Sequence, residues 1–394
     1  MVNLKLPIFA LCLSLVSASQ ADIESVSSCS KIVGSVVILD SALSTIDLSN
    51  IEEIEGGVYV LGTTNLTSLK MDSLKSLTGD ILMLKNSGLT DFSAKSLSNV
   101  NNFNATLNPN LRELNLSSLS IALDFYIFSN SVSALNINSL LNARDVTIIL
   151  NSQLEFISFQ KLTSCSGSLS INGNFLVPDV QLPSLTQVQK NIIFSYISNL
   201  NASLLSSNGG ELVFSNNEIQ EFSLDSLKSI GGSLTFLEND KLKSFEMPEL
   251  TTIGKGLLIT DNSEPLSIQD NSFPKLASIG GMVVISGNIK TFNLPEIKNV
   301  IGNVVIQSFG DFNCNNKITQ NPEYISGFGS CKWTGNPSFG PHYNPIYSII
   351  TNTSQSSVSN GIIFESFSYI KTFIFYQVLL IIFVVFIILV WRNI

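Results

Sequence analysis

Glu238 and Asp261 are the two side chains whose types and spacing come closest to a catalytic arrangement. They occupy the same position in successive units of a repeat, and carboxylates on neighbouring coils are the groups that a polysaccharide-cleaving β-helix would use. The equivalent positions before and after hold Asn216 and Gly287. Because no third acid and no basic or aromatic subsite accompanies the pair, we expect solvated corner residues. A polysaccharide-acting enzyme is therefore the least favoured alternative, and no catalytic residue is assigned.

The sequence lacks the residues that other common types of active site require. His342 is the single histidine and lies in a Pro-rich stretch, which argues against a histidine triad or a histidine metal cage in the repeats. Phosphate-binding loops and dinucleotide fingerprints are not found, and the recurrent Gly pairs are structural. The net charge of −9, without a basic cluster, disfavours nucleic acid as a partner. We expect no cofactor, no metal and no nucleic-acid ligand.

The elements that would position any site come from the repeat itself. Ser229 to Phe245 typifies one unit: a Gly pair, then Leu234 and Phe236 alternating with outward residues, then Asn239. Alternation of this kind predicts a strand with one buried face. The Asn recurs about every 22 residues at Asn86, Asn108, Asn130, Asn151, Asn174, Asn217, Asn239, Asn262 and Asn288.

A period this short leaves room for strands and turns but not for a helix in each unit. The sequence therefore predicts an all-β fold, a right-handed parallel β-solenoid of about thirteen coils, leucine-rich and with at least two sheets. Stacked Asn side chains are expected at one corner, since the amide donates and accepts and Asn tolerates unusual backbone angles. Ser41, Thr63 and Ile197 replace the Asn in three coils. Residues 22–333 form one domain without an internal linker.

Residues 1–21 are predicted to be a secretory signal peptide. Lys5 precedes an apolar run that is too short to span a bilayer, and small residues follow it. Cleavage after Ala18, Ser19 or Ala21 fits equally well. A modest polar cap is expected over residues 22–31, because the open end of a solenoid is an exposed sheet edge.

Five Asn-x-Ser/Thr sequons follow the leader. Asn104 and Asn115 each lie between two inward residues and should point outward, while Asn65 lies at the Asn corner. Outward placement is what a glycan requires. We expect N-glycosylation at Asn65, Asn104, Asn115, Asn201 and Asn352.

Four cysteines remain after the leader. Cys314 and Cys331 flank the last coil and are expected to form a disulfide that closes a C-terminal cap. Cys165 occupies an inward position of the repeat and is expected to be buried and unpaired. Six coils at roughly 4.8 Å each separate it from Cys29, which is beyond disulfide reach. Cys29 is left without an assigned partner.

The C-terminal part differs in composition. Residues 334–360 form a short Pro- and Ser/Thr-rich stalk, and residues 361–394 include an uncharged run over 372–391. This run is long enough to be a transmembrane helix. It also fits a GPI-attachment signal that follows small residues, with Ser359 or Asn360 as the attachment site. The residues alone leave both alternatives open.

Several segments together resemble a known family. They are SCSKIVGSVVI at 28–38, LTSLKMDSLKSLTGDILM at 66–83, the recurrent SIGG, and the closing FNC…SC pair at 312–331. The sequence resembles the fungal GPI-anchored cell-wall organisation proteins, which include yeast sporulation-specific wall proteins and are built on receptor L-domain-like repeats. This resemblance implies a cell-surface glycoprotein without catalysis and favours GPI. Many relatives carry a longer Ser/Thr stalk, so the short one here points to the sporulation branch.

The expected function is a contribution to fungal cell-wall organisation, with ascospore-wall assembly as the more specific form. The protein would lie on the outer leaflet of the plasma membrane or in the wall, as a monomer. Wall polysaccharide or wall proteins are its expected partners. The alternative is a receptor-like module that binds wall glycan or protein and is held by a transmembrane helix. Phe125 and Ile127 are inward by register, so no apolar binding face is evident.

Overall fold

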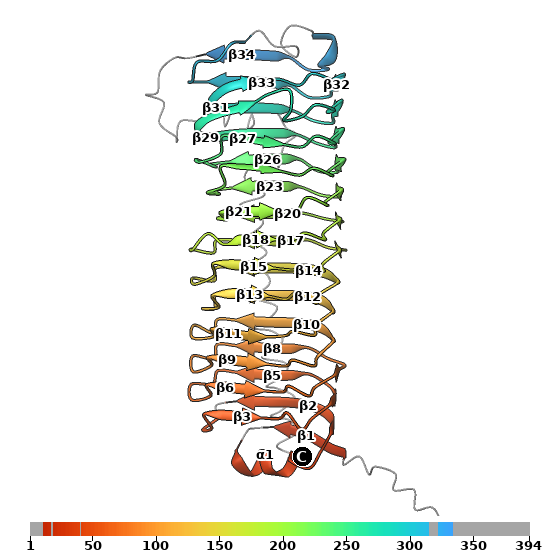
Figure 1. Ribbon diagram of the computed structural model, residues 1–394, viewed down its shortest axis with the longest axis vertical. Helices are drawn as coiled ribbons and strands as arrows, with labels where there is room; N and C mark the ends of the chain where they lie inside the picture. Colours follow the sequence, from red (N-terminus) through yellow and green to blue (C-terminus); the bar gives the residue numbers. More distant parts are fainter. Residues whose placement is uncertain (1–10, 17–18, 40, 315–321, 334–394) are drawn as a thin grey trace, which may run out of the picture. The chain divides into compact units, whose positions relative to one another are not determined.

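The computed structural model of the protein describes residues 11–16, 19–39, 41–314 and 322–333. The described residues belong to the first compact unit of the chain, residues 1–337. The predicted stalk and C-terminal signal, residues 334–394, lie outside the described residues. In the first unit, strands stack coil upon coil into a β-solenoid of about 13 turns (Figure 1). The all-β solenoid predicted from the sequence is confirmed.

One parallel sheet of 24 strands runs the length of this unit. Its longer strands include one per coil: β2 Lys31–Leu39, β5 Val58–Leu61, β8 Ile81–Leu84, β10 Asn99–Thr106, β12 Ile121–Phe128, β14 Asn142–Ile149, β17 Leu169–Asn172, β20 Ile192–Ser195, β23 Leu212–Ser215, β26 Leu234–Leu237, β29 Leu257–Ile268, β31 Val283–Phe292, β33 Val304–Ser308 and β34 Gly329–Trp333. Shorter strands precede many of these: β4 Glu53–Glu55, β7 Ser76–Leu77, β16 Ser164–Cys165, β19 Gln187–Val188, β22 Ser207–Asn208, β25 Ser229–Ile230, β28 Thr252–Ile253, β30 Ser278–Ile279 and β32 Asn299–Val300.

Three smaller parallel sheets form another side of the coils. Their strands are β3 Thr45–Asp47, β6 Ser68–Lys70, β9 Asp91–Ser93 and β11 Glu113–Asn115, then β13 Ala134–Asn136, β15 Phe156–Ser158, β18 Asp179–Gln181 and β21 Asn199–Asn201, then β24 Glu221–Ser223 and β27 Ser244–Glu246. The described residues also contain β1 Leu11–Val16, the helix α1 Gln20–Val26 and the 3-10 helix η1 Pro322–Tyr324.

The core consists of the residues that the alternation places inward. Phe125 and Ile127 are fully buried, as expected. In later coils Phe214 lies 5.2 Å from Phe236, and Phe236 lies 4.5 Å from Phe245, ring centre to ring centre. Such offset aromatic pairs add to the free energy gained from burial. Each coil therefore packs mainly on its two neighbours.

Asn side chains join successive coils at one buried corner. Wherever the next coil also has a ladder Asn, the backbone N–H of the ladder residue donates to the Oδ1 of that Asn, at 2.9–3.2 Å. The Nδ2 group reaches back, as when Asn151 donates to the Ile127 carbonyl at 3.1 Å. Members are Thr63, Asn86, Asn108, Asn130, Asn151 and Asn174, then Asn217, Asn239 and Asn262. Ile197 interrupts the ladder, although its N–H still donates to Asn217 Oδ1 at 3.0 Å.

The unusual backbone angle at this corner belongs to the residue before each Asn, not to the Asn. Leu107 has φ 56°, Leu150 has φ 56° and Tyr196 has φ 55°. Ordinary residues pay about 1–2 kcal/mol for this left-handed conformation, so the ladder hydrogen bonds hold a strained turn in place. The expectation that Asn is used for its backbone tolerance is therefore wrong, and its role is hydrogen bonding.

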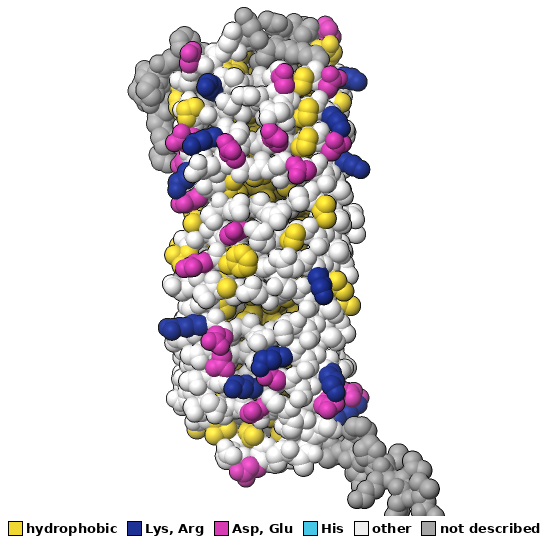
Figure 2. Space-filling model, viewed as in Figure 1, with side chains coloured by type: hydrophobic (Ala, Val, Ile, Leu, Met, Phe, Trp, Pro, Cys, Tyr) yellow, Lys and Arg dark blue, Asp and Glu magenta, His cyan; other side chains and the backbone are white. Residues whose placement is uncertain are grey.

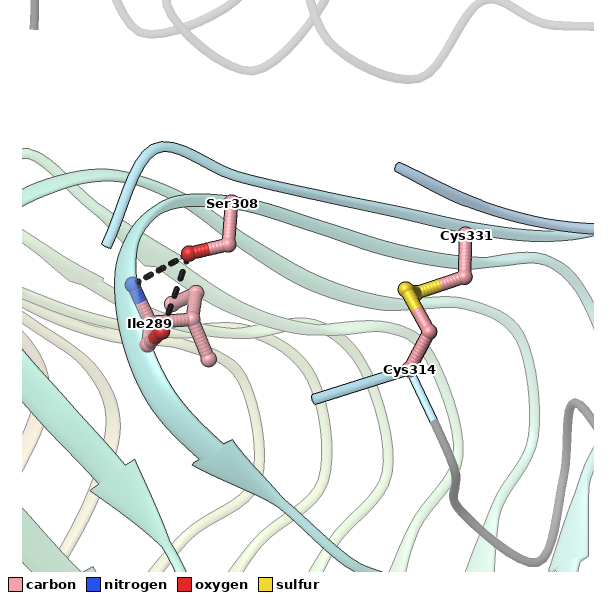
Figure 3. The surroundings of a disulfide bond; sticks show 4 residues. All are labelled: Ile289, Ser308, Cys314 and Cys331. Atoms are coloured by element: carbon pink, nitrogen blue, oxygen red, sulfur yellow. Dashed lines mark hydrogen bonds between the residues drawn. A yellow bond between two sulfur atoms is a disulfide. The ribbon is translucent and has the colours of Figure 1, made fainter. Parts of the chain in front are cut away.

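Asn288 is not part of the ladder. Gly287, rather than Asn288, pairs with Asn262, and the half-buried Asn288 donates its Nδ2 to the Ser263 carbonyl at 3.0 Å. In the next coil Ser308 binds the Ile289 backbone through its hydroxyl, accepting from the N–H at 3.3 Å and donating to the carbonyl at 2.9 Å (Figure 3). A serine thus replaces the amide at the last corner.

A second ladder supports the bend that precedes the longer strands. Side-chain oxygens here accept from the backbone N–H one coil further: Asp145 from Ser168 at 2.6 Å and Glu211 from Ser233 at 2.7 Å. Close packing accompanies the bend, since a Cβ on Gly231 would lie 2.2 Å from the Gly209 carbonyl oxygen. Only glycine permits this approach, which explains the recurrent Gly pairs.

The two ends of the solenoid are closed differently. At the start, α1 has a capping box in which Ser19 and Asp22 bind each other's backbone N–H, and Val26 joins the core. Cys29 is disulfide-bonded. At the other end, Cys314 and Cys331 form a disulfide with Cα atoms 5.9 Å apart (Figure 3), the pairing expected from the sequence.

Candidate functional site

Glu238 and Asp261 lie where the repeat places them, in one column of the corner beside the Asn ladder. Both have positive φ, 54° and 55°, and the Glu238 N–H donates to the Thr260 carbonyl at 3.2 Å. Glu238 is exposed, and its Oε2 accepts from Asn216 Nδ2 at 2.7 Å. An exposed carboxylate that is hydrogen-bonded by a neighbouring amide fits a corner residue better than a general acid.

Charged side chains elsewhere in the solenoid serve to join coils. Lys75 pairs with Glu52 at 2.7 Å, Lys95 with Asp72 at 2.7 Å, and Lys241 with Glu218 at 2.9 Å, each across one coil. Figure 2 shows acidic and basic side chains side by side on the viewed face, with broad uncharged surface between them. Within the described ranges, no group of three or more potential metal ligands is found.

Exposed apolar side chains gather at the corner where the ladder breaks. Phe175 is 68% exposed, and Leu150, Leu176 and Tyr196 are exposed as well. Leu150 lies against Gly173 of the next coil, where an added Cβ would come within 2.9 Å of the leucine side chain. Tyr196 occupies the position equivalent to Gly173 one coil further. We call these four residues the corner patch. Sequence reasoning missed it, because the inward register was used to judge apolar exposure and corner residues have no register.

The outward row of the large sheet is free of charge. Strand pairing aligns Val37, Tyr59, Leu82, Asn104, Tyr126, Thr147, Ser170, Ile193, Val213, Thr235, Leu258, Val284, Val305 and Ser330. Many of these are buried or half-buried, and burial raises the pKa of Tyr126 to about 12. This row therefore adds apolar residues to the outer side of the sheet, beyond the inward residues such as Phe125 and Ile127 that the sequence analysis considered.

The sequons differ in accessibility. Asn65 is exposed, Asn115 and Asn201 are half-buried, and Asn352 lies outside the described residues. Asn104 points outward between buried Phe103 and Ala105, as expected, but it is only 6% exposed. Its Oδ1 accepts from the Thr106 hydroxyl at 2.5 Å. Outward direction alone therefore does not give room for a glycan at this site.

Cys165 is buried and unpaired in the structure. It lies in the column of Val188, Asn208 and Ile230, as the repeat predicts. Burial, with a smaller effect of Asp145, raises the pKa of the thiol to about 12. A thiol that is both buried and protonated at neutral pH is a poor nucleophile, so this residue serves the core.

The sequence predicts a membrane anchor only in the C-terminal part of the chain. Across the part of the chain that the structure describes, no helix combines the length and apolarity needed to cross a bilayer. The run over 372–391, Ser359 and Asn360 all lie in residues that are not described.

Comparison with known proteins identifies relatives of the chain. No family model matches the sequence, and no solved structure matches it. Protein ecm33 of Aspergillus fumigatus is 30% identical over 317 residues, which cover 80% of this chain and 78% of that protein. A cell surface GPI-anchored protein of Arthroderma benhamiae is 29% identical over 297 residues, 75% of this chain and 76% of that protein.

A third relative matches a shorter part. Sporulation-specific protein 2 of Saccharomyces cerevisiae is 28% identical over 171 residues, 43% of this chain and 34% of that protein. None of these three relatives is named as an enzyme. The identity to the Aspergillus protein extends over most of both chains, and the resemblance to fungal cell-wall proteins is thereby confirmed. The chain belongs to the Ecm33 family of fungal cell-wall proteins.

Proposed function

We propose that the protein is a non-enzymatic cell-surface glycoprotein that helps to organise the fungal cell wall. The observation that carries this proposal is the use of its polar side chains: Asn151, Asp145 and their equivalents are committed to joining coils. The relatives named as wall and surface proteins support the same function. A rigid rod made in this way suits a spacer or scaffold.

Loss of the protein should alter the wall. The carboxylates of Glu238 and Asp261 should not be needed for this function. Deletion cells complemented with the Glu238→Gln and Asp261→Asn double variant should resist wall-perturbing dyes as wild type does. Turnover of labelled wall polysaccharide by the purified wild-type protein, abolished in the double variant, would show instead that the protein is an enzyme.

The protein reaches the surface by removal of residues 1–21 and is held there by a GPI anchor at Ser359 or Asn360. The GPI-anchored relative supports this anchor over a retained helix. Phosphatidylinositol-specific phospholipase C should then release the protein from membranes. Resistance to the lipase, with recovery of a peptide covering residues 362–371, would show that the transmembrane alternative is right.

The more specific role is ascospore-wall assembly, supported by the likeness to sporulation-specific protein 2 and by the short stalk. Imaging of a tagged protein tests it. The tag should accumulate at the developing spore wall in sporulating cells. Equal amounts in vegetative walls, with normal spores in a deletion strain, would restrict the function to general wall organisation.

A receptor-like binding module is the second candidate, and the corner patch favours it. Aromatic and aliphatic side chains exposed together on a soluble surface commonly mark a contact site. Pull-down with β-glucan or chitosan particles should retain wild type more strongly than a Phe175→Ser and Tyr196→Ser double variant. The exposed Leu204, which lies outside the patch, provides the matched control as Leu204→Ser. Equal retention of all three proteins would remove this candidate.

A further inference from the structure

One corner turn of the solenoid is shorter than its neighbours. Only residues 196–198 join β20 to β21, whereas residues 173–178 join β17 to β18 in the coil before, and residues 216–220 join β23 to β24 in the coil after. The strands that follow the turns keep their register, since Val180 still pairs with Leu200. The short turn therefore lacks the residues that would stack on the middle of the turn before it.

Phe175 and Leu176 are the residues left without this cover, and they are 68% and 43% exposed. Val177 follows them with φ 45°, an outlier for a β-branched residue, and its N–H donates to the Asn174 carbonyl at 3.0 Å. Strained backbone of this kind is concentrated at functional sites, where surrounding contacts hold it. The turn thus presents the Phe175 ring in a fixed position, which reduces the entropy that a ligand must overcome on binding.

The corner on which the patch lies is free of charge over five coils. The residues directly before the ladder position are Leu107, Ser129, Leu150, Gly173 and Tyr196, and those directly after it are Pro109, Ser131, Ser152, Phe175 and Ser198. Charge returns one coil to either side, with Lys85 before and Glu218 after, and Glu218 is paired with Lys241 at 2.9 Å. Because these positions offer a charged ligand no opposite charge, the corner patch favours a neutral one.

The size of the corner patch favours a thin ligand over a folded protein. Its four side chains are far fewer than the roughly 20–30 residues that each partner contributes to a standard protein interface. An extended peptide binds by pairing with a strand edge, but these residues lie in turns. Leu150, Phe175 and Tyr196 come from three successive coils, which are spaced by roughly 4.8 Å. This spacing is close to the advance of one sugar unit in an extended β-1,4-linked polysaccharide.

The side chains of the corner patch also match the groups of such a chain. The C–H groups on the face of a sugar ring pack on aromatic rings, which Phe175 and Tyr196 supply. Sugar hydroxyls both donate and accept hydrogen bonds, as do the amide of Gln153 and the hydroxyl of Ser198, which are exposed in the coils before and after Phe175. The exposed Leu176 adds an apolar surface that suits the methyl of an N-acetyl group.

We propose that the corner patch binds a neutral chain of β-1,4-linked N-acetylglucosamine, with its axis along the solenoid and its sugar rings on Phe175 and Tyr196. The proposal rests on the receptor-like function proposed above and names the ligand of that module. Removal of the acetyl groups gives the polycation chitosan. Since the corner has no carboxylate to pair with its ammonium groups, the deacetylated chain should bind more weakly.

The test uses the mature protein released from cells by lipase or detergent, with isothermal titration calorimetry as the measurement. The ligands are a short oligomer of N-acetylglucosamine and the fully deacetylated oligomer of the same length. We expect the acetylated oligomer to bind wild type at least about tenfold more tightly than the deacetylated one. Its affinity should change less than about twofold between about 0.05 and 0.5 M salt, because no ion pair is involved.

Variants locate the site. Phe175→Ala should weaken binding of the acetylated oligomer at least about tenfold, and Tyr196→Phe, which keeps the ring, should bind as wild type does. The matched control is Phe328→Ala, which removes a phenylalanine that is 52% exposed near the end of the solenoid and should leave the affinity unchanged. Thermal unfolding should be similar in all four proteins.

Three results would overturn the proposal. They are equal or tighter binding of the deacetylated oligomer, equal affinities of Phe175→Ala and wild type, and a wild type that does not bind the acetylated oligomer. Retention of this last wild type on β-glucan particles, lost in the double variant at Phe175 and Tyr196, would show that the ligand is wrong while the receptor-like function stands. The lipase and dye experiments do not depend on any of these results.

Discussion

The middle coils and the last coils satisfy the backbone N–H groups of the corner in different ways. In the middle, from Thr63 to Asn151, each corner N–H donates to the amide oxygen of the next Asn. In the last coils Gly287 pairs with Asn262, Ser308 binds the Ile289 backbone, and the Cys314–Cys331 disulfide follows. A repeated Asn can form hydrogen bonds to both adjacent coils where a coil lies on each side. Near an end, where one neighbour is lost, a covalent bond replaces it.

Removal of the disulfide should have the largest effect, and it should be confined to the last coils. The bond closes a loop with a sequence separation of 17, and a loop of that size contributes about 3 kcal/mol to the free energy of unfolding. We expect Cys314→Ala with Cys331→Ala to lower the melting temperature of the last coils. Limited proteolysis should cut first after residue 283 in the variant. Cuts distributed along the whole solenoid would contradict a local staple.

Breaking the ladder in its middle should come next. Asn151 is fully buried, and its side chain accepts from the Asn130 backbone N–H at 3.0 Å and donates to the Ile127 carbonyl at 3.1 Å. Asn151→Ala leaves buried backbone groups without partners, which should reduce the free energy of unfolding by about 1–3 kcal/mol. Urea unfolding followed by circular dichroism measures the loss.

Asn288→Ala is the matched control, since Asn288 resembles a ladder residue in sequence but lies outside the ladder. Its single hydrogen bond to Ser263 is exposed, so the expected loss is below about 0.5 kcal/mol. Equal losses at Asn151 and Asn288 would remove the distinction between the two regions.

A small effect that depends on pH is expected at the surface of the ladder coils. Burial by itself would raise the pKa of Asp72, but hydrogen bonds from Lys95 and Ser93 outweigh it and hold that pKa below its usual value. A lowered folded-state pKa means that the carboxylate stabilises the fold above about pH 4 and that this contribution is lost as the pH falls through the folded pKa. Asp72→Asn should therefore lower stability at pH 7 by less than about 1 kcal/mol.

The pH series supplies the check on this prediction. The difference in unfolding midpoint between Asp72→Asn and wild type should shrink below about pH 4. A difference that persists unchanged at pH 2.5 would show that Asp72 acts through packing rather than through its charge.

The sequence was sufficient for the features that repeat in residue type. The Asn period and the inward alternation locate the corner and the core, and Cys165 falls in its column, because identical positions in a stack face identical surroundings. The second ladder, at the bend before the longer strands, was not predicted. Its acceptors belong to four residue types: Asp145, Asn191, Glu211 and Ser233. What these positions share is an acceptor oxygen, which a search by residue identity does not detect.

Other features depend on how coils meet, and the sequence carries weaker signals for them. The positive φ of Leu150 and Tyr196 reflects the turn that precedes the corner residue. Neither leucine nor tyrosine is a residue type that predicts this backbone angle. Asn104 is outward by register, yet it is buried beside Thr106. The corner patch likewise arises where Tyr196 stacks beyond Gly173. Register gives the direction of a side chain, while exposure depends on the neighbours.

Native-state hydrogen exchange tests the central claim most directly, because it reports each corner amide separately. The claim is that the Asn ladder makes the middle coils the most stable part of the solenoid. The amides of Asn108, Asn130 and Asn151, which donate to ladder oxygens, should exchange only through the largest openings. The amides of Ile289 and Phe309 should exchange faster, and the Asn151→Ala variant should bring the Asn130 amide to their level. Uniform protection along the solenoid, unchanged by Asn151→Ala, would contradict the account.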